Sequence, residues 1–130
     1  MAHPNEEIAR RAFEALHKNR DSDAISQYFA EDLEYHLGGD TAVSGDRKGR
    51  AALVAGMDRV SDLGIEASYD LHDVVANDEH AVMLISSHLE REGKAPYEQP
   101  AVWVVHVDDG KITEIWSFLF DQAAVKKFVS

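Results

Sequence analysis

The segment from Ala101 to Asp121 constrains the fold most, because two apolar strands flank a tight turn within it. Its sequence is AVWVVHVDDGKITEIWSFLFD, and the Asp-Asp-Gly at its centre is a strong hairpin signal. Both strands carry apolar residues on both faces, so we expect both faces of the sheet to be covered. In a small domain, helices can cover one face and a partner subunit the other. Such an architecture usually encloses a pocket.

The two faces of this hairpin predict different surroundings. Pairing Val107 with Lys111 would set Trp103 opposite Ile115, and Ala101 opposite Ser117, on one face. The other face carries Val102, Val104, Ile112, Trp116, Phe118 and Phe120. A soluble monomer rarely exposes an apolar patch of that size. We therefore expect a homodimer through the second, convex face, with an interface formed by Val102, Val104, His106, Trp116 and Phe118.

The hydrophobic pattern predicts one α+β domain over residues 1–130, a length typical of a single domain. Helical spacing indicates helices over 6–18, from Asp21 or Ser22 onward, and from about 49 to 63 with Gly64 as the stop. A short strand is expected over 33–37, and four long strands follow from residue 65. Asp121 is expected to cap a final helix over 122–129. The predicted product is a curved antiparallel sheet with helices gathered on one side.

Composition excludes several classes of function. The chain has 24 acidic and 13 basic residues and a net charge of −11, which disfavours nucleic acid and anionic membrane surfaces as partners. It has no cysteine, which excludes disulfides and thiolate nucleophiles. None of its seven histidines shows a recognised zinc-binding spacing, so we expect neither a metal nor another cofactor. The lack of an apolar signal segment makes a cytoplasmic protein the expectation.

Several phrases along the chain resemble the SnoaL-like branch of the nuclear transport factor 2-like superfamily. They are ARRAFEAL, ISQYFAEDLEYH, GRAAL, YDLHDVV and GKITEIWSFLFDQAA, in that order. The branch includes ketosteroid isomerases and polyketide cyclases. The resemblance implies a cone-shaped fold with an apolar pocket between the helices and the concave sheet face. It does not imply one activity, since the fold hosts isomerases, cyclases, epoxide hydrolases, dehydratases and non-catalytic modules.

The chain departs from the catalytic patterns of both relatives. The tyrosine of ketosteroid isomerases would fall at Ala12 or Phe13, and the protonated acid at Trp103. The general base would fall at Leu37, or at His36 after a one-residue slip. The aspartate of the SnoaL-type cyclases would fall near Ser117, and a serine cannot replace it as an acid or base. Steroid isomerisation by the known route is therefore disfavoured, and the cyclase assignment is weakened.

Other polar groups are candidates for the pocket. Tyr35 is in phase with Leu37 and faces the expected pocket, as either a hydrogen-bond donor or an aromatic wall. Strict alternation turns His36 outward, whereas a bulge near Gly38 would turn it inward as a general base. The orientation of His88 is open as well. The catalytic candidates are therefore His36 and Tyr35. The expected pocket lining is Phe13, Tyr28, Leu37, Met57, His88, Trp103, Ile115, Ser117 and Leu119.

Two functions remain open at this point. One is cofactor-free proton transfer on an apolar small molecule that bears a carbonyl or hydroxyl group. The other is a non-catalytic module that binds a ligand or dimerises. Arg47, Lys48 and Arg50 form a small basic cluster before the third predicted helix, and such a cluster is usually a solvated loop or at most guides an anion to the pocket mouth.

Overall fold

The computed structural model of the protein describes residues 3–130 and has four α-helices, one π-helix and six strands. The helices are α1 (Pro4–Phe13), the π-helix η1 (Glu14–Asn19), α2 (Ser22–Tyr28), α3 (Arg50–Asp62) and α4 (Gln122–Val129). The strands are β1 (Phe29–Leu37), β2 (Gly45–Lys48), β3 (Ile65–Ala76), β4 (His80–Arg91), β5 (Tyr97–Asp108) and β6 (Lys111–Leu119).

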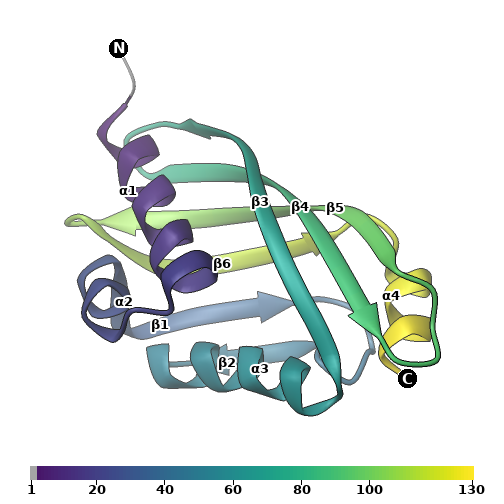
Figure 1. The fold of residues 1–130 in the computed structure, drawn as a ribbon. Coiled ribbons are helices and arrows are strands. Elements are labelled where there is room, and N and C mark those ends of the chain that lie inside the picture. The colour runs from purple at the N-terminus through teal and green to yellow at the C-terminus, as the bar shows by residue number, and fades with distance from the viewer. Residues whose placement is uncertain (1–2) are drawn as a thin grey trace.

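The six strands form one open, curved sheet in the order β2-β1-β6-β5-β4-β3 (Figure 1). Every neighbouring pair is antiparallel except β1 and β6, which run parallel. The helices α1, α2 and α3 pack on one side of the sheet, and α4 packs near the end of β4. The predicted α+β architecture is confirmed.

The N-terminal helix differs from its predicted course. We expected one helix over 6–18, but α1 ends at Phe13 and continues as η1 to Asn19. A π-helix bonds from i to i+5 and so holds one more residue per closed turn than an α-helix. Arg20 ends the segment in the left-handed conformation with φ of 50°. Asp21 then caps α2 by accepting a hydrogen bond from the Asp23 amide.

The strands before α3 are longer and more numerous than predicted. The strand expected over 33–37 begins at Phe29, and β2 lies where a polar loop was expected. β2 is mostly exposed and polar, so the alternation that reveals a half-buried strand is absent from its sequence. Its pairing with β1, not its own pattern, makes it a strand.

The last hairpin has a different register from the one predicted. Asp108 pairs with Lys111 around a two-residue turn in which Asp109 and Gly110 both have positive φ, 51° and 78°. A bulge then shifts the pairing between His106 and Val107. The result sets Trp103 opposite Ser117 and Ala101 opposite Leu119.

The bulge also corrects the predicted face of Ile112. We expected Ile112 on the convex face, but it is fully buried in the core, because the extra residue Thr113 reverses the alternation. A second bulge, after Leu71 in β3, has the same effect. There, Val74 is buried while Val75 is 56% exposed.

The main core lies between the helices and the concave face of the sheet. Phe29, Leu33 and Ile115 are among its fully buried side chains. α4 covers a second, smaller cluster with Val125, Phe128 and Val129. No helix among residues 3–130 is long and apolar enough to cross a membrane.

Candidate functional site

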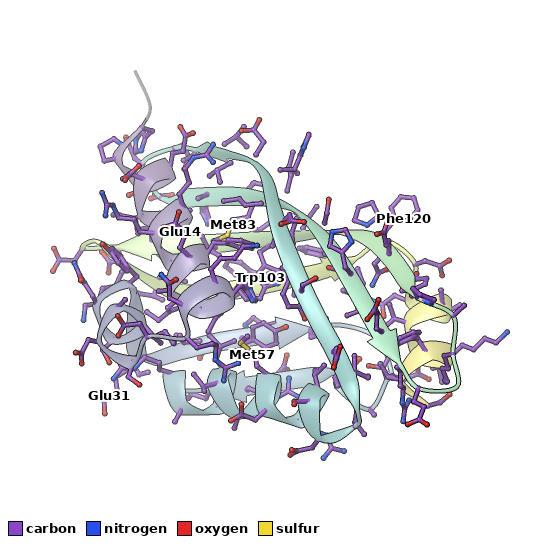
Figure 2. The ribbon with its side chains drawn as sticks, viewed as in Figure 1. Glu14, Glu31, Met57, Met83, Trp103 and Phe120 are labelled. Carbon is purple, nitrogen blue, oxygen red and sulfur yellow. The ribbon has the colours of Figure 1, made fainter. Side chains whose placement is uncertain are left out.

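A cavity of about 450 Å³ lies between η1, α3, α4 and the concave sheet face. That volume is in the range of small-molecule sites. Its lining is mostly apolar, with a few polar side chains placed among the hydrophobic ones. Figure 2 shows Trp103 of β5 and Met57 of α3 between the helices and the sheet, and both line this cavity.

The period-two pattern of the strands explains the polar groups of the cavity floor. Inward positions on β4, β5 and β6 include Ser87, Gln99 and Ser117, which are buried at 4%, 6% and 6% exposure. All three line the cavity. The Gln99 side-chain oxygen accepts bonds from the Tyr97 hydroxyl and the Asp121 amide, both at 3.3 Å.

The structure places the predicted pocket residues in two groups. The residues that line the cavity are Tyr35, Leu37, Met57, Trp103, Ser117 and Leu119. The residues that do not are Phe13, Tyr28, Ile115, His88 and His36. Phe13 and Ile115 face inward but lie in the close-packed core. Tyr28, at the end of α2, packs against that core.

His36 lies on the convex face, so the outward of its two predicted orientations is the observed one. Its Nδ1 lies 2.8 Å from an Asp46 carboxylate oxygen and its Nε2 lies 2.7 Å from a Glu114 carboxylate oxygen. These two hydrogen bonds, to Asp46 first and then Glu114, raise the pKa of His36. Glu34, His36 and Glu114 offer ligand atoms within 4.8 Å of one another. Within this group, His36 and Glu114 are joined by the 2.7 Å hydrogen bond, and Glu34 is exposed.

His88 also points away from the cavity. β4 and β5 pair without a register shift, so the even-numbered residues of β4 face outward. Nδ1 of His88 lies 2.8 Å from Glu98 and Nε2 lies 3.0 Å from Asp70. The hydrogen bond to Glu98 is the main cause of its raised pKa.

The histidine that does line the cavity is His17, which was not among the predicted site residues. Its ring centroid lies 4.8 Å from that of Phe13, 4.5 Å from that of Tyr69 and 5.3 Å from that of Trp103. Its buried Nδ1 has no hydrogen-bond partner among residues 3–130. One sequence signal was available, because Phe13 and His17 are four residues apart and so lie on one helix face.

The electrostatics of the cavity keep His17 neutral. Burial, and to a lesser extent the neighbouring charges of Arg20 and Lys18, lower the pKa of His17 to about 3. An unprotonated imidazole can donate one hydrogen bond and accept another. His17 therefore presents a neutral donor and acceptor to anything that enters the cavity.

Two tyrosines of the cavity stay protonated for the same reason. Burial raises the pKa of Tyr69 to about 12, with a smaller contribution from Tyr35. Burial also raises the pKa of Tyr35, partly offset by the Ser117 hydroxyl and the Arg47 guanidinium. The Tyr35 and Trp103 rings meet edge to face at 5.9 Å. Both tyrosines can donate a hydrogen bond to a ligand oxygen.

Two arginines line the cavity as well. Arg20, just after η1, donates to the Asp58 carboxylate at 2.9 Å. Arg47 of β2 donates to the Val43 carbonyl at 3.0 Å and lies with its Cζ 5.9 Å from the Tyr35 ring centroid. The cavity thus combines an apolar body, a neutral imidazole, two phenols and two cationic groups.

Comparisons with known proteins agree with this geometry. The model of the SnoaL-like domain family matches residues 9–115. A sequence comparison with curated proteins gives no match. Among solved structures, Bal32a from a soil-derived mobile gene cassette has a TM-score of 0.88 at 24% identity, covering 99% of this chain and 98% of that one.

Two further structures extend the comparison. An NTF2-like protein of Burkholderia xenovorans LB400 has a TM-score of 0.84 at 23% identity, covering 100% of this chain and 98% of its own. A candidate polyketide cyclase of Xanthomonas campestris pv. campestris has a TM-score of 0.72 at 24% identity, covering 98% and 97%. At these identities the likeness concerns the fold.

Proposed function

Because the chain belongs to the SnoaL-like domain family, we propose that it binds an apolar small molecule in the cavity and transfers a proton on it without a cofactor. The substrate class is a compound with a carbonyl or hydroxyl group on an apolar body. Isomerisation, cyclisation, dehydration and epoxide opening all belong to this chemistry. The observation that supports the proposal most is the neutral, partly unpaired His17 imidazole among aromatic rings in the cavity.

The roles follow from the donors and acceptors of the cavity. Tyr35 and Tyr69, both protonated, would donate to the substrate oxygen where negative charge develops. His17 would accept a proton from the neighbouring carbon or hydroxyl. A pKa of about 3 makes the free imidazole a weak base at neutral pH. An oxyanion formed beside it would favour the imidazolium and so help the transfer.

The same low pKa supports the second candidate, a binding module without turnover. A base whose pKa lies near the working pH is the most effective, and His17 departs from that condition. In this case His17 and the tyrosines would only orient a ligand by hydrogen bonds. Binding without proton exchange is the behaviour that distinguishes the two candidates.

Deuterium uptake tests the proposal directly. Benzo-fused bicyclic ketones with exchangeable α-protons, such as 2-tetralone, would be incubated with the protein in D₂O and followed by mass spectrometry. We expect the wild type to exchange the α-proton faster than buffer, and His17→Phe to lose at least about a hundredfold of that enhancement, in the range of general-base catalysis. If Trp103 fluorescence reports binding of the ketone but no deuterium exchange occurs, the second candidate, the binding module without turnover, is supported. The absence of both would contradict the pocket assignment.

His36→Ala belongs in the same experiment, because His36 was the acid/base candidate from the sequence. Its side chain is on the convex face, held between Asp46 and Glu114. We expect the exchange rate of His36→Ala to equal that of the wild type. A loss matching that of His17→Phe would return the assignment to His36.

We also propose that the protein forms a homodimer through the convex face of the sheet. Val102, Val104, His106 and Trp116 remain partly exposed there, and Phe118 is 55% exposed. Burying this face against a second copy would remove the apolar patch from water.

A further inference from the structure

Arg47 stands out among the cavity residues because its charge faces an apolar space. Arginine stays charged at any physiological pH. Among residues 3–130, no carboxylate forms a salt bridge with its guanidinium, although acids outnumber bases by 24 to 13. Arg20, the other cavity arginine, already has Asp58 as its partner. Glu66 also borders the cavity, but it is exposed and forms no ion pair with Arg47.

Three contacts hold the Arg47 side chain in place. Its Nη2 donates to the Val43 carbonyl at 3.0 Å, and its Cζ lies 5.9 Å from the centroid of the Tyr35 ring. Gly56 of α3 leaves room for it, since a Cβ there would lie 3.3 Å from the Arg47 Nε. The bond to Val43 uses one of the five guanidinium N–H groups. The arginine is therefore oriented by its surroundings while donors remain for a ligand.

The neighbours of Arg47 suit an anion. Tyr35 is a protonated phenol that can donate to the same oxygen group, and its raised pKa keeps it in that form. A planar guanidinium binds a carboxylate through two parallel hydrogen bonds, and such charged bonds are stronger than neutral ones. An apolar, partly closed surrounding strengthens the attraction relative to water.

We propose that Arg47 binds a carboxylate of the ligand, so that the substrate is an apolar, ring-bearing compound that carries a carboxylate in addition to its reacting carbonyl or hydroxyl group. This inference rests on the proposed function, because it uses the same cavity. It adds the charge of the ligand and the residue that selects it. Arg47 also belongs to β2, which the sequence pattern did not reveal as a strand.

Matched acid and amide pairs test the selection. The probes are 2-naphthoate and 2-naphthamide, followed by benzoate and benzamide, with affinity measured by Trp103 fluorescence and calorimetry. We expect the wild type to bind each carboxylate at least about ten times more tightly than its amide. Arg47→Met should lower the affinity for each carboxylate to that for its amide and leave the affinity for the amide unchanged. Lys48→Met, the neighbouring residue outside the cavity lining, removes the same charge and should alter neither affinity.

Two other variants sharpen the test. Arg47→Lys keeps the charge but loses the fork geometry, so part of the acid preference should remain. Gly56→Ala should weaken carboxylate binding by displacing the guanidinium, while the amide binds as before. Equal affinities for acid and amide in the wild type, or an undiminished preference in Arg47→Met, would overturn the inference. Failure of all four probes to bind would overturn it together with the pocket assignment. A retained acid preference without proton exchange would refute only the catalytic part of the proposed function.

Discussion

At the scale of single residues, the histidines divide by the face on which they lie. His17 is enclosed by aromatic rings and beside two cationic residues, so its charged form is disfavoured. His36 and His88 lie on the other face between carboxylates, so their charged forms are favoured. The two groups therefore make stability depend on pH in opposite directions.

We predict that His17 weakens the fold in acid. Its pKa falls from about 6.5 in the unfolded chain to about 3 in the fold. The unfolded state then binds more protons between these values, and the free energy of unfolding falls as pH drops through that window, by up to about 1.4 kcal/mol per pH unit. Between pH 7 and pH 4.5, the free energy of unfolding of His17→Phe, measured with urea, should fall by about 2 kcal/mol less than that of the wild type.

Phe13→Leu is the control for this measurement. It disturbs the same aromatic group without removing a titratable side chain, so its acid-dependent loss should match that of the wild type. His36 and His88 have raised pKa values, so their contribution is present below about pH 6.5 and is lost at higher pH. It is common to all three proteins and cancels in the comparison. Equal losses in wild type and His17→Phe would contradict the burial of a neutral imidazole.

At the scale of elements, regular patterns could be predicted and their interruptions could not. α4 and its cap at Asp121 were predicted with their observed bounds, because a capping residue and a polar-to-apolar change mark that start. The predicted face of Ile112 and the predicted register of Trp103 were wrong, because a bulge inserts a residue that local sequence preferences do not indicate. His17 was not predicted as a site residue, because the helical spacing of its segment indicates a face packed in the core and not a cavity wall.

We predict that the α4 cap contributes measurable stability. The Asp121 Oδ1 accepts a hydrogen bond from the Ala124 amide at 3.0 Å, and α4 covers the second core cluster. Asp121→Ala should lower the free energy of unfolding by about 1 kcal/mol in chemical denaturation. Asp121→Asn, which keeps an acceptor, should lose much less. If Asp121→Ala unfolds at the same denaturant concentration as the wild type, the cap is not a source of stability.

At the scale of the whole molecule, the sheet separates the concave face, which lines the cavity, from the convex face, for which we propose dimerisation. The concave face and the helices enclose the cavity, while the convex face keeps large side chains in contact with solvent. Trp116 lies among polar groups there, with its ring centroid 6.1 Å from that of His36 and 6.2 Å from that of His80. In a dimer through the convex face, this mixed polar and apolar surface of one copy would contact the same surface of the other copy.

We predict that Trp116→Glu disrupts a dimer formed by the convex faces, because it would bury a carboxylate in an apolar contact. Size-exclusion chromatography with light scattering should show the wild type as a dimer and Trp116→Glu as a monomer or an aggregate. Arg11→Gln makes the same change in net charge on an exposed position of α1, and it should remain a dimer. A monomeric wild type, or a dimer unaffected by Trp116→Glu, would rule out this interface.

The group that the π-helix η1 presents to the cavity depends on the number of residues in this segment. An i to i+5 turn accommodates one residue beyond the α-helical count, and such turns are frequent at functional sites. Removing a single residue from Glu14–Asn19 would let the segment wind as an ordinary α-helix, with the positions after it keeping their faces and those within it shifting around the helix axis. His17 lies within this segment, so its place in the cavity lining depends on that extra residue. A single-residue deletion here would thus change which group the segment presents to the cavity, with no change in the strands that form the cavity floor.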